Sequence, residues 1–364
     1  MKSTPWTTAE AEALMGRRIL VIGDLILDRY IWGQADRVSP EAPVLVLEHR
    51  SENVLLGGAG NVVSNLAAAG ARPLPCGVVG RDENGRLVRE MFQCLGAAVG
   101  GVFTDSSRPT IEKTRLLAAN QQILRIDREQ RHVLSDAMRG RLSRWIERVL
   151  PSCDGVILSD YLKGVLSAPL IHHVATLCHK RGIPVVADPK GLDYARYEGV
   201  DFITPNLREA MTASHIADDG AGALARAGRR LLAITRGRGV VVTRGHEDTA
   251  LFLKGARPVM VPIHPREVYD VTGAGDTFIA YFALALFGGH DPEKAVALGN
   301  LAGGLAVEKI GCVAVPMSDV IQELGKLPPD GPLTSRPSSH GRNTPAGKSL
   351  NKGGHGVRSL MDGM

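Results

Sequence analysis

Short apolar runs alternate with longer stretches of helical spacing along most of the chain. The apolar runs, which are typical of buried parallel strands, lie at residues 18–24, 155–159, 184–187, 202–204 and 239–243. The stretches of helical spacing lie at residues 61–69, 137–150, 169–180, 209–214, 221–232 and 278–287. This alternation predicts an α/β fold, in which a parallel sheet is covered by helices on both faces.

Two segments interrupt the alternation, residues 30–54 and 109–127. Both contain extended stretches such as 44–47 and 110–116, and neither contains a helix of its own. We interpret them as a small, partly separate sheet that forms a lid over a cleft. The exposed edges of such a sheet are natural dimerisation surfaces, so we expect a homodimer through the lid.

Each predicted strand ends in a polar or glycine-rich element. These elements are Gly23-Asp24, Ser159-Asp160, Asp188-Pro189-Lys190, Thr204-Pro205-Asn206 and Thr243-Arg244-Gly245. Ligands of open α/β sheets bind at the carboxyl ends of the strands. We therefore expect all five elements to meet at one cleft.

Composition and charge exclude several classes of protein. The chain has 364 residues, of which 44% are hydrophobic and 22% charged, as in an ordinary globular protein. The net charge is +5, but residues 327–364 hold five Arg and Lys against two Asp, so the main body carries only about +2. That balance does not indicate a nucleic-acid-binding surface.

The cysteines and the two terminal segments indicate the cellular compartment of the protein and the limits of its folded domain. Five scattered cysteines without a Cys-x-x-Cys motif suit a reducing compartment. The N-terminal segment lacks the apolar core of a signal peptide, and no run approaches the length of a membrane span, so we expect a cytoplasmic protein. Residues 326–364 are rich in Pro, Gly and Ser and are predicted to be disordered, which leaves residues 1–325 as the folded domain.

The most informative stretch is residues 269–278, a glycine-rich turn before an apolar helix. Free N–H groups of Gly273, Ala274 and Gly275 at a helix start favour an anion such as phosphate. Asp276 beside them is placed to take a proton from a hydroxyl group that attacks the phosphate. The alternative is a tight turn in which Asp276 only caps the helix.

A second glycine-rich turn, residues 56–61, opens another helix. Gly57, Gly58 and Asn61 suit a hydroxyl-rich ligand, or else close packing of a helix on a strand. Asp24 and Asp28 follow the first strand, and carboxylates there suit sugar hydroxyls, although Asp24 is equally a turn cap.

Two further groups of residues carry charge or metal-binding chemistry. Asn206 and Glu209 suit a hydrated magnesium ion, but the same spacing is that of a helix capping box. Lys113 and Arg115 alternate on one face of a predicted lid strand and suit an anionic substrate such as a sugar phosphate, with Asn120 nearby. The alternative for the two cations is a solvated strand edge.

These motifs occur together and in order, and in this the chain resembles the ribokinase-like (PfkB-type) carbohydrate kinases. Residues 57–61 and 270–277 look like the two signatures of that family. Within it the chain looks like the bacterial heptose 7-phosphate kinases of lipopolysaccharide core synthesis. The segments that carry this narrower resemblance are 23–30, 37–44, 113–115, 120–122, 158–164, 188–191 and 204–209.

The resemblance implies a ribokinase-like three-layer α/β/α sandwich with a small β-sheet lid. It implies that ATP, with Mg²⁺, phosphorylates D-glycero-D-manno-heptose 7-phosphate at the anomeric O1 to give heptose 1,7-bisphosphate. The rivals are a kinase for another sugar, sugar phosphate or nucleoside and, in a different class, a non-catalytic sugar- or nucleotide-binding regulator. Bifunctional relatives continue into a nucleotidyltransferase domain, whereas this chain ends in a polar tail, so we expect the adenylyltransferase step on a separate polypeptide.

The resemblance also implies a role for each motif residue. Asp276 is the general base, and the backbone of Gly273, Ala274 and Gly275 holds the transferred phosphoryl group. The substrate-binding residues are Asp24, Asp28, Gly57, Gly58, Asn61, Lys113, Arg115 and Asn120, with Lys113 and Arg115 on the 7-phosphate. The nucleotide-binding residues are Lys190, Asn206, Glu209, Thr243, Arg244, Gly245 and Asn300, of which Asn206 and Glu209 also organise magnesium.

Overall fold

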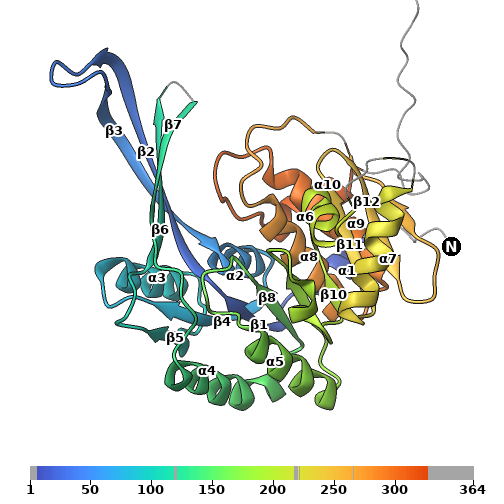
Figure 1. Ribbon diagram of the computed structural model, residues 1–364. Coiled ribbons are helices and arrows are strands. Elements are labelled where there is room, and N and C mark those ends of the chain that lie inside the picture. Colours follow the sequence, from blue (N-terminus) through green and yellow to red (C-terminus); the bar gives the residue numbers. More distant parts are fainter. Residues whose placement is uncertain (1–5, 119–120, 217–219, 221, 265, 327–364) are drawn as a thin grey trace, which may run out of the picture. The chain divides into compact units, whose positions relative to one another are not determined.

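The computed structural model describes residues 6–118, 121–216, 220, 222–264 and 266–326 (Figure 1). The chain divides into two compact units, Met1–Leu333 and Thr334–Met364. The second unit and all of the predicted tail except Lys326 lie outside the described residues, so the boundary at residue 325 stays a prediction.

A nine-stranded sheet forms the centre of the first unit, in the order β13-β12-β11-β10-β9-β8-β1-β4-β5. Its strands are β1 (Arg18–Gly23), β4 (Arg72–Val79), β5 (Gly101–Thr104), β8 (Gly155–Ser159), β9 (Val185–Asp188), β10 (Phe202–Ile203), β11 (Gly239–Arg244), β12 (Glu247–Leu253) and β13 (Val259–Val261). In this order, the strands from β11 through β1 to β5 pair in parallel with their neighbours. Strands β12 and β13 pair antiparallel at one edge. The carboxyl ends of the parallel strands therefore lie along one side of the sheet.

Helices cover both faces of this sheet. Alternate side chains of β1 divide between two apolar clusters, because successive residues of a strand point to opposite faces. The cluster around Ile19 and Val21 includes side chains of α1 (Thr8–Glu12), α2 (Ala59–Ala68), α3 (Glu83–Cys94), α8 (Ala274–Phe287), α9 (Pro292–Ala306) and α10 (Met317–Leu324). The cluster around Leu20 and Ile22 includes side chains of α4 (Asp136–Val149), α5 (Ala168–Arg181), α6 (Leu207–Ala213) and α7 (Ala223–Thr235).

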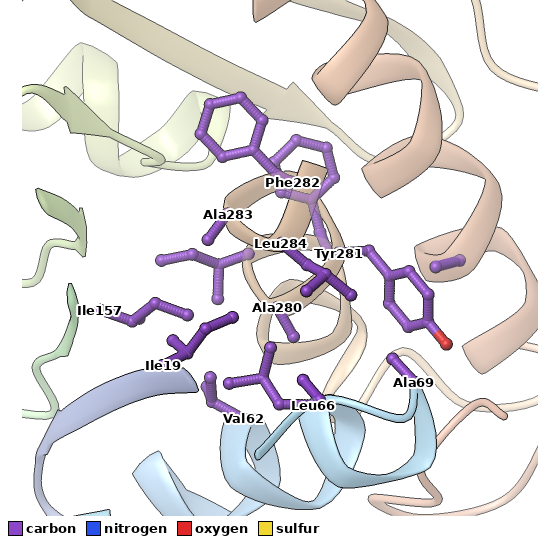
Figure 2. Packing of buried hydrophobic residues seen from close by; sticks show 14 of the residues in the cluster. Ile19, Val62, Leu66, Ala69, Ile157, Ala280, Tyr281, Phe282, Ala283 and Leu284 are labelled. Atoms are coloured by element: carbon purple, nitrogen blue, oxygen red, sulfur yellow. The ribbon is translucent and has the colours of Figure 1, made fainter. Parts of the chain in front are cut away.

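Helix α8 runs through the middle of its layer. Every residue from Asp276 to Phe287 is buried, as expected for a helix that is apolar on all sides. In Figure 2 its Ala280 and Leu284 lie beside Val62 and Leu66 of α2. The small Ala280 side chain lets the two helices approach closely, and this packing sets the start of α8 against the start of α2.

A second, four-stranded sheet has the order β3-β2-β6-β7. Its strands are β2 (Leu25–Val38), β3 (Leu45–Gly58), β6 (Ile111–Ala118) and β7 (Gln121–Arg128). A single residue, Asp24, separates the end of β1 from the start of β2, and β3 runs directly into α2. The small sheet is therefore joined to the large one at the carboxyl end of β1 (Figure 1).

The predicted three-layer α/β fold with a small second sheet is confirmed. Residues 155–159 form β8 with the predicted bounds, and the other predicted strands and helices agree within a few residues. Two strands that we did not predict, β12 and β13, pair antiparallel at one edge of the sheet, because the short connections β11–β12 and β12–β13 favour antiparallel hairpins. No helix among the described residues is long and apolar enough to cross a bilayer.

Candidate active site

The glycine-rich turn before α8 has a backbone that only glycine adopts easily. Gly273 caps the helix with φ +80°, and a Cβ atom there would lie 2.6 Å from Nδ2 of Asn61. At Gly275 the position of a Cβ atom is open, with no heavy atom within 4 Å. The turn thus packs tightly against Asn61 on one side and leaves room for a ligand at the helix start on the other.

Asp276 lies in the first turn of α8 and is 3% exposed. Its Oδ2 accepts a hydrogen bond from Nδ2 of Asn61 at 2.9 Å, and its Oδ1 accepts one from the Tyr161 hydroxyl group at 2.7 Å. Burial, reinforced by the charge of Asp188, raises the pKa of Asp276 to about 7, although the two hydrogen bonds act in the opposite direction. A carboxyl group with this pKa exchanges a proton readily near neutral pH.

Asn61 is held in place by the first turns of α2. Nδ2 of Asn65 donates to the backbone oxygen of Asn61 at 3.0 Å and to its side-chain oxygen at 3.2 Å. The Asn61 amide therefore presents its N–H group to Asp276. Gly57 and Gly58 precede this helix, and both are required by close contacts: a Cβ atom at Gly57 would lie 1.9 Å from Oδ2 of Asp28, and Gly58 has φ +56°.

Asp24 has the environment of a turn cap, one of the two roles that we expected. It is fully buried, and its carboxylate accepts backbone hydrogen bonds from Tyr161 at 2.9 Å, Lys163 at 3.0 Å and Val165 at 3.2 Å. Burial raises its pKa to about 6 despite these bonds. The structure thus places Asp24 as the anchor of the loop after β8, as in the capping alternative, and its contact with a sugar stays a prediction.

Asp28 and the two lid cations share one face of the small sheet. The Arg115 guanidinium is paired with Asp28, and its Cζ lies 5.1 Å from the centre of the Tyr30 ring. Lys113 has no carboxylate partner among the described residues; its Nζ lies 5.3 Å from the centre of the Tyr161 ring. Burial lowers the pKa of Lys113. Of the two predicted phosphate ligands, Lys113 is therefore the one without a direct ion pair among the described residues, although the charges of Asp28 and Asp127 act on it.

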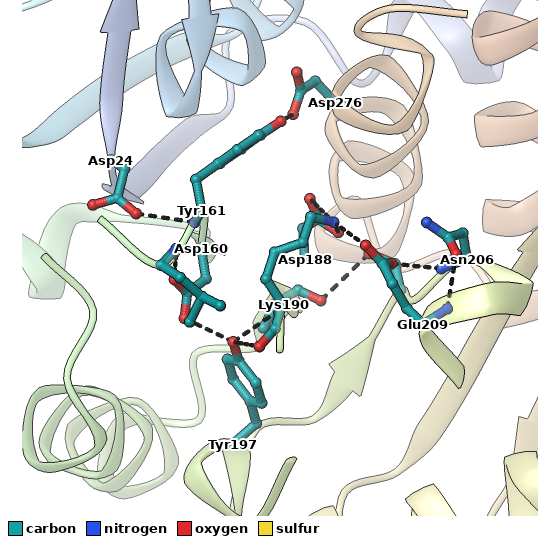
Figure 3. A network of polar contacts seen from close by, with 12 residues as sticks. Asp24, Asp160, Tyr161, Asp188, Lys190, Tyr197, Asn206, Glu209 and Asp276 are labelled. Carbon is teal, nitrogen blue, oxygen red and sulfur yellow. Dashed lines mark hydrogen bonds and ion pairs between the residues drawn. The ribbon is translucent and has the colours of Figure 1, made fainter. Parts of the chain in front are cut away.

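A second polar network lies at the carboxyl ends of β9 and β10 (Figure 3). Lys190 places its Nζ 3.1 Å from Asp188 and 2.8 Å from Glu209. Burial raises the pKa of Asp188 to about 6, because a charged carboxylate is costly there. For Lys190 burial acts to lower the pKa, but the two carboxylates outweigh it and raise the pKa above its usual value.

The predicted capping box is present at the start of α6. The Asn206 side chain accepts from the backbone N–H of Glu209 at 2.9 Å, and the Glu209 side chain accepts from that of Asn206 at 2.9 Å. Asn206 also forms a bridge to Thr243 at the end of β11. The polar residues of three neighbouring strand ends are thus brought together, as the sequence predicted.

Residues 17–319 match the pfkB family of carbohydrate kinases. The chain belongs to this family. The bifunctional protein HldE of Geobacter sulfurreducens is 46% identical over 306 residues, which are 84% of this chain and 62% of that protein. The protein of the same name from Geobacter metallireducens is 47% identical over the same lengths.

Solved structures show the same fold at low sequence identity. Ribokinase of Arabidopsis thaliana, solved with ribose and ATP, has a TM-score of 0.68 at 21% identity and covers 86% of this chain and 100% of its own. Phosphofructokinase-2 of Escherichia coli, solved with potassium, has a TM-score of 0.69 at 18% identity with the same coverage.

The chain spans about 62% of the length of the HldE proteins that it matches. Those relatives are named as bifunctional, which runs partly against our expectation that the adenylyltransferase step belongs to a separate polypeptide. That expectation stays a prediction.

Asn206 and Glu209, the two predicted magnesium ligands, offer side-chain oxygens, although these already accept the capping-box hydrogen bonds. Magnesium prefers hard oxygen ligands and is commonly held by one or two protein carboxylates together with phosphate oxygens and water. Glu209 already holds one cation, the ammonium group of Lys190, 2.8 Å away. No group of three acidic, His or Cys side chains suited to a metal occurs among the described residues, so magnesium binding at Asn206 and Glu209 stays a prediction.

Of the predicted nucleotide-site residues, Thr243 adjoins this network through its bridge to Asn206. Arg244 at the end of β11 is paired with Glu247, and Gly245 forms the turn into β12 with φ +66°. Asn300 on α9 accepts from Thr249 at 2.7 Å and donates to the backbone oxygen of Pro262 at 3.1 Å. These contacts place Asn300 against β12 and β13. Asn120, a predicted lid ligand, lies outside the described residues.

Sequence analysis gave no role to Tyr161, Asp188 or Asn65, although the first two lie in segments that carry the family resemblance. Each follows from the same signal as the predicted residues: Tyr161 and Asp188 lie at or just after the carboxyl ends of β8 and β9, and Asn65 lies one turn after Asn61. What the sequence does not show is that all three act on the Asp276 carboxylate. Tyr161 bonds to it directly, Asn65 holds its partner Asn61, and the charge of Asp188 raises its pKa.

Asp276→Asn should stabilise the folded chain relative to the wild type, and this gain should grow as the pH rises. Below about pH 4 the wild-type carboxyl is protonated in both the folded and the unfolded state. Above about pH 7 it is ionised in both, and the buried charge destabilises the folded wild type. Above pH 7 we expect a gain of about 4 kcal/mol that fades toward pH 4. Urea unfolding at several pH values measures it, with Asp136→Asn on the surface as the charge control. A gain that does not change with pH would contradict the buried-charge account.

Proposed function

We propose that this carbohydrate kinase transfers the γ-phosphoryl group of ATP to the anomeric O1 of D-glycero-D-manno-heptose 7-phosphate. The products are heptose 1,7-bisphosphate and ADP, and the step belongs to the synthesis of ADP-heptose for the lipopolysaccharide core. The observation that carries the proposal is the buried Asp276 carboxyl beside a glycine turn, in a chain 46% identical over 306 residues to a protein named HldE.

The chemistry follows from the positions of Asp276 and the turn. The ionised Asp276 takes the proton of the sugar O1–H as O1 bonds to the γ-phosphorus, and the bond from that phosphorus to the β–γ bridging oxygen breaks to release ADP. Backbone N–H groups of the turn from Gly273 to Gly275 donate to the oxygens of the transferred group. The open space at Gly275 allows this close approach. The carboxylate must be ionised for the first step, so the activity falls as the pH drops below about 7.

The nucleotide phosphates bind beside the network of Lys190, Asn206 and Glu209. The cation of Lys190 compensates phosphate charge, and Asn206 and Glu209 would hold magnesium, which neutralises the charge on the β- and γ-phosphates when bound. Thr243, Arg244, Gly245 and Asn300 line the remaining nucleotide site. Their positions at the end of β11 and on α9 support this arrangement.

The sugar binds between the start of α2 and the small sheet. Asp28, Gly57, Gly58 and Asn61 line this side, and the tight contacts at both glycines leave the backbone close to the ligand. Lys113 supplies the charge that distinguishes a phosphorylated sugar from a neutral one, since its ammonium group has no carboxylate partner among the described residues. Arg115 contributes through Asp28, whose charge it balances.

The small sheet also supports the proposed homodimer. It exposes large apolar side chains near its far end: Val38 at 60%, Leu45 at 54%, Leu124 at 52% and Ile126 at 53%. Strands β3 and β7 are its edges, and unpaired edges with apolar side chains favour association with a second sheet. A second copy of the chain would cover these side chains.

Release of ADP from MgATP by the purified chain tests the proposal, with heptose 7-phosphate, fructose 6-phosphate, ribose and adenosine as acceptors. We expect heptose 7-phosphate to be preferred at least about a hundredfold in kcat/KM, and Asp276→Asn to lose about 10²–10⁴-fold in kcat. Preference for an unphosphorylated acceptor would contradict the heptose assignment. A variant Asp276→Asn that keeps wild-type kcat would contradict the general base.

Lys113→Met should raise the KM for heptose 7-phosphate about 10- to 100-fold and leave the KM for ATP unchanged, because a charged hydrogen bond to the sugar phosphate is lost. Arg128→Met is the matched control, since Arg128 is a cation of the neighbouring strand and lies on the opposite face of the same sheet, across from Glu112. Steady-state kinetics with each substrate varied in turn measures both constants. Equal KM values for wild type and Lys113→Met would remove Lys113 from the phosphate site.

Ile126→Asp should dissociate the proposed dimer, because a charge at the centre of a buried apolar contact has no partner. Light scattering should give twice the chain mass of 38.8 kDa for the wild type and one chain mass for the variant. Val133→Asp, at a position that is 68% exposed and outside both sheets, is the control that should remain dimeric. A monomeric wild type would refute the dimer.

A further inference from the structure

Tyr161 contacts three parts of the site at once. Its hydroxyl group donates to Oδ1 of Asp276 at 2.7 Å (Figure 3). Its ring lies beneath two cations, with Nζ of Lys113 at 5.3 Å and Nζ of Lys190 at 5.9 Å from the ring centre. Tyr161 thus lies between the proposed base, the lid and the phosphate side of the cleft.

We propose that Tyr161 is a positioning residue, whose hydroxyl group fixes the orientation of the Asp276 carboxylate toward the acceptor hydroxyl. The proposal rests on the proposed function, because it matters only where Asp276 acts as a base. Asn61 holds one oxygen of the carboxylate and Tyr161 holds the other, so rotation of the carboxylate is blocked from both sides. Each oxygen keeps a further lone pair that can accept the acceptor O–H.

The loop that carries Tyr161 is fixed at its start by Asp24. The three backbone hydrogen bonds to this buried carboxylate hold Tyr161, Lys163 and Val165 in one conformation. Between them Leu162 has φ +55°, a left-handed backbone that non-glycine residues rarely adopt. Such a conformation persists only where surrounding contacts fix it, and it is typical of functional sites.

The same loop is tied to the base of the lid. Lys163 Nζ lies 2.6 Å from Oε2 of Glu129, and both side chains are buried. Glu129 directly follows β7, so this ion pair connects the small sheet to the loop. Arg108 adds a second tie, since it donates to the backbone oxygen of Lys163 at 3.0 Å. The position of the Tyr161 hydroxyl group therefore depends on both the large sheet and the lid.

Tyr161 acts as a donor and not as the base itself. Burial and the charge of Asp276 raise the pKa of its hydroxyl well above the usual value, so the group keeps its proton at neutral pH. The other charged or titratable groups that face Asp276 are Asp188 at the end of β9, Lys190 just after it and Cys312 before α10. None of these forms a hydrogen bond to its carboxylate among the described residues, whereas Tyr161 does.

Tyr161→Phe tests this role, because it removes the hydroxyl group and keeps the ring beneath the two lysines. We expect kcat to fall about 10- to 100-fold, with the KM of the acceptor changed by less than about threefold. The acidic limb of the kcat profile should also move to higher pH, because the carboxylate loses a donor that stabilises its charged form. A merely structural role would not move this limb.

Tyr194→Phe is the matched control, because it also removes a buried phenol hydroxyl, and this one has no hydrogen-bond partner among the described residues. We expect its kcat and pH profile to match the wild type. Glu129→Gln is a second test that leaves Tyr161 intact: loosening the tie to the lid should lower kcat about 3- to 10-fold and move the limb in the same direction. If Tyr161→Phe does not fold, the kcat and the pH profile of Glu129→Gln test the positioning role in its place.

The kinetics use the acceptor that gives the highest turnover in the panel, so they do not depend on the heptose assignment. Tyr161→Phe with wild-type kcat and an unmoved acidic limb would overturn the positioning role while leaving the kinase intact. Loss of kcat in Tyr161→Phe without movement of the limb would also overturn it. By contrast, full activity in Asp276→Asn would be a failure of the proposed function and not of Tyr161 alone.

Discussion

The burial of one carboxyl group, that of Asp276, is the constraint on which the rest of the site depends. A carboxylate in an apolar interior is costly, and hydrogen bonds from Asn61 and Tyr161 only partly offset this cost. The carboxyl group is therefore held close to the balance between its charged and neutral forms near pH 7. A proton acceptor at neutral pH needs this balance. The cost is sustained by the apolar packing of α8, which is buried along its whole length after the turn.

The two sheets meet around this group. Packing of α8 against α2 brings Asp276 to Asn61, which are 215 residues apart in the chain. The carboxyl ends of β1 and β8 supply Asp24 and the loop of Tyr161, and the ends of β9 and β10 supply Lys190 and the capping box of α6. The small sheet adds Lys113 and the tie from Glu129. In the proposed reaction, charge for the phosphates and a base for the hydroxyl thus come from different layers of the fold, which meet at the carboxyl ends of the strands.

Much of this arrangement could be predicted from the sequence, because apolar runs of strand length followed by polar residues are strong local signals. Strand β8 is an example, with bounds that agree to the residue. Strand β4 was missed because Pro73 and Pro75 argue against a central strand. The structure tolerates them since β5 pairs only from Cys76 onward, which leaves the first half of β4 without a partner on that side. The sequence left two roles open for Asp24, a turn cap and a sugar ligand, because its partners lie 137 residues or more away and depend on the folded loop.

The central claim is tested most directly by the titration of Asp276 itself. Carbon-13 NMR of chain labelled at the aspartate carboxyl groups would follow its signal with pH, and the spectrum of Asp276→Asn would identify it. The account predicts a midpoint near pH 7. A midpoint near pH 4, the ordinary value for an aspartate in water, would show that burial does not raise the pKa of Asp276 and would contradict the account.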